Sequence, residues 1–246
     1  MTAAAQAATD VTGIRTVAVV SLLKNDLQLQ TTGMTRFDNS SNAVATGWDL
    51  DGTVQRRVAA ALGGRFQLRN ATLPPGLFDH LEGGLFESPR SILAKRIQAL
   101  PAPAGVDAYL IVVPQWGLMR DETRGIFAYH DAGLLTGKGT LISLPYGIGL
   151  YDVHSGKFLG GGNGEIPWAG TFSGYGEPSE ECADDFWPGE PAALNDTQKA
   201  QIRQEAFSLL ERSVPFALAD AGLISEDAAK AMQASAAPAP PSCHGI

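Results

Sequence analysis

The stretch Val106-Asp-Ala-Tyr-Leu-Ile-Val-Val113 is a continuous apolar run, typical of a strand buried on both faces. A second ribbon runs from Thr140 to Val153. Read with a period of two, its large apolar residues share one face: Ile142, Leu144, Tyr146, Ile148 and Leu150. The other face is mostly small: Leu141, Ser143, Pro145, Gly147, Gly149 and Tyr151. We expect the first face to pack in the core and the second to permit a bend or a close approach.

The ribbon ends in a segment with turn chemistry, His154-Ser-Gly-Lys157, and the chain leaves through Phe158 and Leu159. This pattern predicts a long β-hairpin.

Two strands are predicted near the start of the chain. Val17–Leu23 is a short apolar run, and residues 27–32 alternate between apolar and polar. Lys24-Asn-Asp26 has turn chemistry, so we expect these strands to form a hairpin. The polar stretch 38–47 is expected to be a loop.

Helical spacing appears in four places. Asp49 or Asp51 caps an apolar stripe that Gly63-Gly64 ends, and Ser88-Pro89 starts a second helix that ends at Pro101. Between them, 65–69 alternates like a strand. A third helix opens at Asp196, and we expect Pro215 to kink or split it. Ser225 caps a short closing helix.

This order predicts an α/β (α+β) fold with one mixed β-sheet, a long C-terminal β-hairpin and about three flanking helices. We assign a single domain to 16–233, with an irregular aromatic and acidic arm at 160–191 and C-terminal helices at 196–233. Residues 1–15 are interpreted as a flexible N-terminus, and 234–246 as a Pro/Ala-rich tail.

The composition and charge of the chain limit the classes of partner that we expect it to bind. The 246 residues are 44% apolar and 18% charged, as in globular proteins, and the formal charge is −8. Six acidic residues between 177 and 190 carry most of that charge, and no basic cluster indicates nucleic-acid binding. No apolar run is long enough for a transmembrane segment, and residues 1–10 do not read as an intact signal peptide. Both a mature periplasmic chain and a cytoplasmic one fit this start.

The two cysteines, Cys182 and Cys243, fall in the acidic segment and in the tail. Spacing alone leaves open whether they form a disulfide or stay as free thiols. Neither belongs to a metal-binding pair, and no phosphate-loop, dinucleotide or catalytic-serine motif is present. We therefore expect no cofactor and no metal site.

One set of residues suits catalysis and another suits partner binding. The enzymatic alternative is a small hydrolase or metal-dependent enzyme that uses His130, Asp131, Asp152 and His154. Asp152 and His154 also suit a plain turn, and the segment around His130 also suits a solvated hairpin tip. The candidate partner-binding residues are exposed-type aromatic and basic side chains in irregular segments: Trp116, Arg120, Arg124, Tyr129, Trp168, Phe172, Tyr175 and Trp187. The aromatic ones also suit a role in anchoring the arm to the sheet.

The element order resembles the small α/β module of bacterial envelope proteins, such as the N-terminal domain of TolB and the CsgG and LpoB lipoproteins. A Val-Asp-Ala strand and an Asp-x-x-Ser/Thr-Gly-Lys hairpin recur there in this order, as Val106-Asp-Ala108 and Asp152-Val-His-Ser-Gly-Lys157 do here. The resemblance covers Thr16 to Gly162 and transfers no functional residue. It implies a non-catalytic cell-envelope binding or scaffold protein, periplasmic, that works through contacts with another protein.

Overall fold

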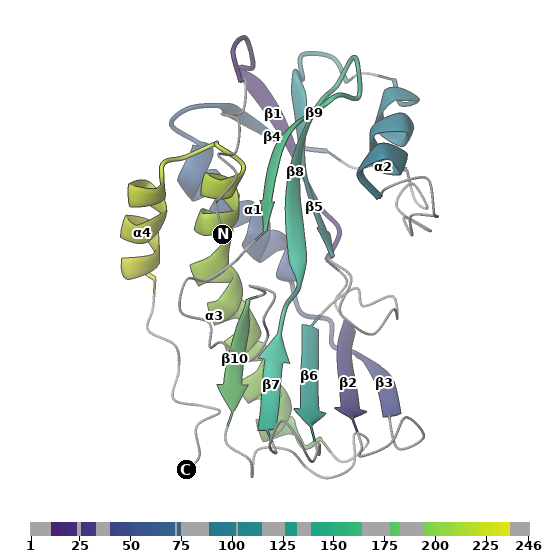
Figure 1. The fold of residues 1–246 in the computed structure, drawn as a ribbon, viewed down its shortest axis with the longest axis vertical. Helices are drawn as coiled ribbons and strands as arrows, with labels where there is room; N and C mark the ends of the chain where they lie inside the picture. Colours follow the sequence, from purple (N-terminus) through teal and green to yellow (C-terminus); the bar gives the residue numbers. More distant parts are fainter. Residues whose placement is uncertain are drawn as a thin grey trace, which may run out of the picture.

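In a computed structural model, the chain forms two five-stranded sheets and four helices within the residues that the structure describes. These described residues are 11–23, 26–32, 40–71, 73–74, 89–101, 103–114, 126–131, 139–163, 178–182 and 194–236. The sheets lie end to end along the long axis of the molecule (Figure 1). The α/β class with mixed parallel and antiparallel pairing is confirmed, and the single predicted sheet is replaced by two.

The first sheet, sheet A, is the α/β part of the molecule. Its strand order is β4-β1-β5-β8-β9, with β4, β1 and β5 parallel and β8 and β9 antiparallel to their neighbours. The strands are β1 (Thr16–Ser21), β4 (Gln67–Asn70), β5 (Ala108–Pro114), β8 (Tyr146–Asp152) and β9 (Phe158–Asn163).

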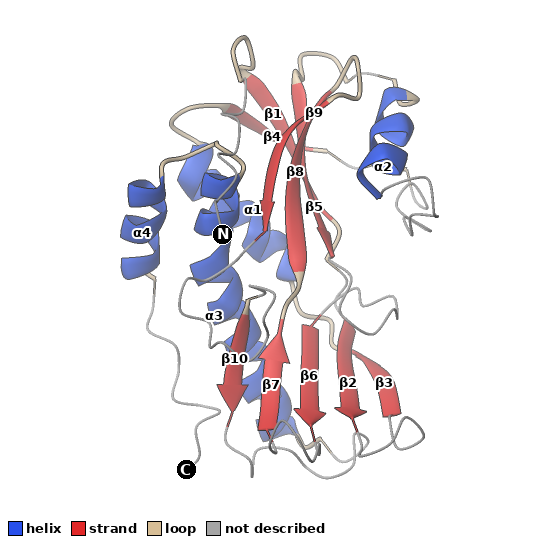
Figure 2. Ribbon diagram, in the orientation of Figure 1, coloured by secondary structure: helices blue, strands red, loops and turns tan. Residues whose placement is uncertain are grey.

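The second sheet, sheet B, has the order β10-β7-β6-β2-β3, in which only β6 and β2 run parallel. Its strands are β2 (Asp26–Thr32), β3 (Ser40–Ala45), β6 (Ile126–Asp131), β7 (Gly139–Ser143) and β10 (Ser179–Cys182). All of them are insertions between elements of the α/β part: β2 and β3 follow β1, β6 and β7 follow β5, and β10 follows β9. Sheet B therefore lies at the carboxyl ends of the parallel strands β1 and β5 (Figure 2).

The predicted ribbon from Thr140 to Val153 joins the two sheets. It forms β7 in sheet B, passes Leu144 and Pro145, and continues as β8 in sheet A. The five large residues predicted to face the core are all buried in one hydrophobic cluster: Ile142, Leu144, Tyr146, Ile148 and Leu150. The bend expected of this ribbon comes where Pro145, which cannot donate to a ladder, separates the two strands.

Helices cover both faces of sheet A. The helices are α1 (Leu50–Leu62), α2 (Pro89–Gln98), α3 (Asp196–Asp220) and α4 (Glu226–Ala234). On one face, Val17, Val19 and Leu110 pack with α1 and α3, whereas Ala18 and Ile111 face α2 (Figure 2). Alternate residues of β1 and β5 thus enter different clusters, which explains why these strands are apolar throughout.

The long helix α3 runs behind both sheets and packs against sheet B as well (Figure 1). Its stripe Ile202, Leu209 and Leu210 is buried in the cluster that also holds Leu27 and Ile142 of sheet B. One continuous core therefore connects the two sheets.

The predicted split at Pro215 is wrong, because the 25-residue helix α3 continues through it to Asp220. A proline in a helix leaves the carbonyl four residues earlier without its donor. Here that carbonyl is Glu211, and Arg57 of α1 donates to it from Nε at 3.2 Å and Nη2 at 2.7 Å. The guanidinium thus replaces the missing N–H.

Two other predictions of local structure are wrong. β1 and β2 do not form a hairpin, since β1 pairs with β4 and β5 whereas β2 pairs with β3 and β6. The expected loop at 38–47 contains the edge strand β3. The first error arises because local turn chemistry predicts pairing of neighbours, whereas the chain crosses to sheet B after Leu23. The second arises because β3 is polar and is formed by its pairing with β2.

Two segments predicted to be irregular contribute strands. The segment 115–138, which connects the two predicted core strands, supplies β6. The 160–191 arm supplies the end of β9 and the whole of β10. The remainder of both segments lies outside the described residues.

The glycine-rich end of β9 is explained by α3. A Cβ at Gly162 would lie 2.4 Å from both the Ala217 carbonyl oxygen and the Asp220 Cβ. Only a residue without a side chain lets the helix approach the strand so closely.

Candidate functional site

The turn that joins β8 to β9 holds two of the candidate catalytic residues. Asp152 Oδ1 accepts hydrogen bonds from the His154 amide at 3.1 Å, the Ser155 amide at 2.7 Å and the Ser155 hydroxyl at 2.6 Å. Gly156 follows with φ +66°. The interpretation as a turn is confirmed, because Asp152 is engaged with the local backbone and glycine supplies the positive φ.

The pKa of Asp152 agrees with its role as the hydrogen-bond acceptor of this turn. The Ser155 hydroxyl, followed by the Ser155 amide, lowers the pKa of the carboxyl, and His154 acts in the same direction. The carboxylate is therefore stabilised in its charged, hydrogen-bond-accepting form, whereas a general acid needs a raised pKa.

His130 and Asp131 lie at the other end of the molecule. They close β6, where His130 pairs with Thr140 and Asp131 with Gly139. From Thr140 the ribbon runs through β7 and β8 before it reaches Asp152 (Figure 1). At about 3.3 Å per residue, those twelve steps span roughly 40 Å when extended. The structure thus places the four candidate catalytic residues in two separate pairs.

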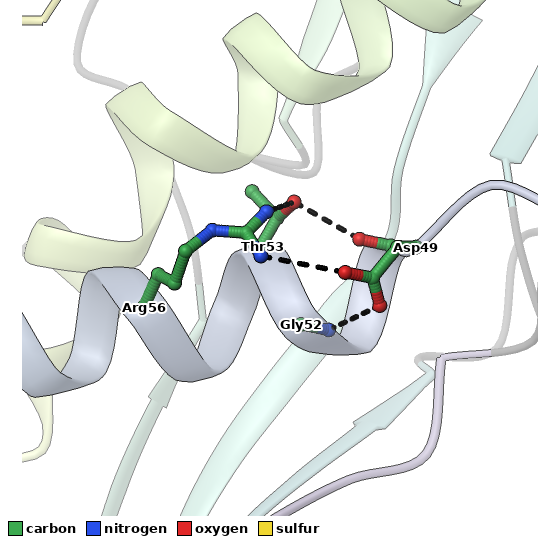
Figure 3. A network of polar contacts seen from close by, with 4 residues as sticks. All are labelled: Asp49, Gly52, Thr53 and Arg56. Carbon is green, nitrogen blue, oxygen red and sulfur yellow. Dashed lines mark hydrogen bonds and ion pairs between the residues drawn. The ribbon is translucent and has the colours of Figure 1, made fainter.

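A network of polar contacts lies at the start of α1 (Figure 3). Asp49 is the N-cap: its Oδ1 accepts from the Gly52 amide at 3.0 Å, and its Oδ2 pairs with Arg56 at 3.3 Å. Arg56 also donates to the Thr53 hydroxyl at 2.8 Å, and that hydroxyl donates to the Asp49 carbonyl oxygen. The groups of this network satisfy one another as an ordinary helix cap does.

Asp51 ties that helix to β1. Its Oδ1 accepts from the Leu23 amide at 3.1 Å, at the point where the chain leaves sheet A for sheet B. Burial raises the pKa of this carboxyl, partly offset by its hydrogen bonds. The arrangement orients the crossover, and the nearby charge of Asp49 also raises the pKa of Asp51.

Most of the candidate partner-binding residues lie outside the described residues: Trp116, Arg120, Arg124, Trp168, Phe172, Tyr175 and Trp187. The backbone of Tyr129 is described, and it lies in β6 opposite Leu141 of β7 and Gln30 of β2. Tyr129 therefore belongs to a strand of the β6–β7 hairpin. The tip of this hairpin lies outside the described residues, so its solvent exposure stays a prediction.

Cys182 ends β10 opposite Thr140 and is buried, with a relative exposure of 5%. It is disulfide-bonded. Cys243 is the only other cysteine of the chain and lies outside the described residues, so its pairing with Cys182 stays a prediction.

Sequence reasoning missed the charged residues buried on α3. Glu205 and Arg212 are almost fully buried, and both have interaction partners. They fall on the apolar stripe of Ile202 and Leu209, three residues after each, and that spacing was the available signal. Charges at such positions are buried only when they are paired.

Within the described residues, no group of three or more His, Cys, Asp or Glu side chains is arranged to hold a metal ion. A search of the same residues finds no helix with the length and apolarity that a membrane span requires.

Comparison with known proteins gives no significant match to a family model, a curated protein or a solved structure. The resemblance to envelope modules therefore stays a prediction, and function has to be argued from the chain itself.

Proposed function

We propose that this chain is a non-catalytic binding or scaffold protein of the bacterial cell envelope that acts through contacts with another protein. The observation that carries the proposal is the position of sheet B. In open α/β sheets, ligands bind in the crevice beyond the carboxyl ends of the parallel strands. Here β2, β3, β6 and β7 occupy that position, and apolar residues of β2, β3 and β7 share the core of sheet A.

The separation of the candidate catalytic pairs supports the same proposal. An enzyme needs its acid, base and nucleophile within hydrogen-bond reach of one substrate. Asp152 and His154 belong to a turn in which the Asp152 carboxylate accepts hydrogen bonds from the turn's own backbone. His130 and Asp131 end a strand in the other sheet.

The envelope location draws support from Cys182. Disulfides persist in oxidising compartments such as the periplasm and are rare in the cytosol. Cys182 is a buried residue of the core cluster and is disulfide-bonded, as we expect of a periplasmic protein.

The contact surface we propose is the face of sheet B opposite α3. No described helix covers that face (Figure 2). Within this sheet, Tyr129 of β6 is paired with Leu141 of β7. The aromatic candidates of the arm, Trp168 and Trp187 among them, flank β10 in the sequence and would extend this surface.

A pull-down from native extract tests the proposal. Residues 164–177 and 183–193 would be replaced, separately and together, by Gly/Ser segments of equal length that leave β10 and Cys182 intact. We expect the full-length chain to recover a partner that the double replacement loses. Equal recovery by every variant would contradict a binding role for the arm, and a turnover assay on the same samples would detect an enzyme.

A further inference from the structure

The two sheets of this protein have four outer strands, and three of them are protected against pairing with another chain. β4 is only four residues long and carries Arg69, and β10 is equally short and carries Glu180 and Glu181. β9 has a bulge against β8 and lies under α3 at Gly162. Short length, charge, bulges and covering elements are the usual ways in which proteins protect a sheet edge.

Among the residues that the structure describes, β3 shows none of these protections. Its six residues, Ser-Ser-Asn-Ala-Val-Ala, contain no charge and no proline, and the pairing with β2 has no bulge. Asn42, Ala43 and Ala45 are exposed, while Val44 packs against the core. No described strand or helix lies against its outer side.

We infer that β3 pairs with β3 of a second copy of this chain, antiparallel and about a two-fold axis, to form a continuous ten-stranded sheet. The chain itself supplies a strand of the kind that this edge accepts: uncharged, of equal length and with small side chains. A two-fold contact uses the same surface on both copies and closes after two.

The register follows from the faces of the strand. Val44 faces the core and Ala43 faces away from it. If the cores of the two copies lie on the same side of the joined sheet, residues that pair across the interface must belong to the same face of β3. A register centred on Ala43 satisfies this condition and places Ala43 opposite Ala43 of the second copy and Ser41 opposite Ala45.

Charge also favours this edge over the opposite one. The chain has a formal charge of −8, and the acidic strand β10 is at the far edge of sheet B from β3. With strands about 4.8 Å apart, the two β10 strands of such a dimer are separated by roughly 43 Å. That is several times the Debye length of about 8 Å at physiological ionic strength, so their repulsion is screened.

A contact of six residues from each copy is smaller than the roughly 20–30 residues of a standard interface. The dimer is therefore weak, and its population depends on protein concentration. This inference is independent of the proposed function, because it concerns the purified chain alone.

Sedimentation velocity from low micromolar to near-millimolar concentration tests it. We expect the wild-type chain to shift from monomer to dimer, and Ala43→Lys to stay monomeric because two lysines would meet at the axis. Ala60→Lys is the matched control, since Ala60 is an exposed residue of α1, and it should dimerise like the wild type. An equimolar mixture of Ala43→Lys and Ala43→Glu should form a heterodimer.

Hydrogen exchange on the wild-type chain gives a second measurement that needs no variant. Amides of 40–45 should gain protection with concentration, and those of β10 should not. A wild-type chain that stays monomeric, a dimer that persists in Ala43→Lys, or protection elsewhere would overturn the inference. A strand from a different protein would leave the purified chain monomeric at every concentration.

Discussion

Arg57 on α1 donates two hydrogen bonds to the backbone carbonyl oxygen of Glu211 on α3, the carbonyl that Pro215 leaves without a helical donor. This contact joins the two helices on one face of sheet A. It also explains how a 25-residue helix accommodates a buried proline without ending.

Arg57→Ala should lower the free energy of unfolding by about 2 kcal/mol, because it leaves the Glu211 carbonyl unpaired in a partly buried site. Denaturant unfolding measures the change.

The double mutant with Pro215→Ala isolates the cause. An alanine at position 215 supplies the missing N–H, so the cost of Arg57→Ala should shrink in that background. An equal cost in both backgrounds would show that Arg57 acts through packing alone.

Gly162→Ala should be strongly destabilising. Its Cβ would meet the Ala217 backbone and Asp220 at 2.4 Å, so β9 and α3 would have to move apart, at a cost of about 1–3 kcal/mol or more. Gly64→Ala is the control, because a Cβ there has no neighbour within 4 Å and no positive φ stands in its way. The thermal midpoint should fall for the first variant and stay within a few degrees for the second.

The disulfide of Cys182 should be with Cys243. Alkylation of the unfolded, unreduced chain should then modify no cysteine, and a monomeric mass should persist on a non-reducing gel. Closing a loop of this length stabilises a protein by about 4 kcal/mol in the chain-entropy model, so a Cys182→Ala, Cys243→Ala variant should unfold at much lower denaturant. A free thiol, or a covalent dimer, would contradict this pairing.

Asp107 should make stability depend on pH on the acid side. Its Oδ2 accepts from the Thr16 amide at 2.8 Å and the Arg15 amide at 2.9 Å, and these bonds lower the pKa of the carboxyl. The resulting stabilisation is present above the unfolded pKa of about 3.9 and is lost as the pH falls through the lower folded value. The difference in unfolding free energy between wild type and Asp107→Asn should therefore shrink from pH 7 to pH 3.

Asp51 gives a control of opposite sign. Burial raises the pKa of its carboxyl, so its contribution is present at low pH and is lost as the pH rises through the folded value. The wild type should lose stability relative to Asp51→Asn as the pH rises. The same trend for both variants would contradict the assigned environments.

Much of sheet A could be predicted from sequence, because apolar runs and caps report burial and helix ends directly. The strand predicted at Val17–Leu23, the start of the third helix at Asp196 and the turn at Gly156 are examples. The strands β2 and β7 of sheet B are expected from sequence, but a second sheet could not be predicted, since β3 and β10 are short and polar and β6 and β10 join it by pairing with distant segments. Local propensity carries no information on such partners.

For the candidate site, sequence patterns could indicate that Asp152 and His154 form a turn, because Gly156 signals it locally. They could not indicate that His130 and Asp131 lie far away, since that depends on the ribbon from Thr140 continuing into β8. The substitute donor Arg57 was likewise hidden, because it lies 154 residues from Glu211 in the sequence.

The separation of those two pairs is tested most directly by pulsed electron paramagnetic resonance between spin labels at His130→Cys and His154→Cys, with the native disulfide left intact. The ribbon geometry predicts a distance distribution centred at roughly 30–40 Å, the upper end being the length of an extended strand pair. A distribution below about 15 Å would contradict the account, because the four residues would then lie within reach of a single substrate.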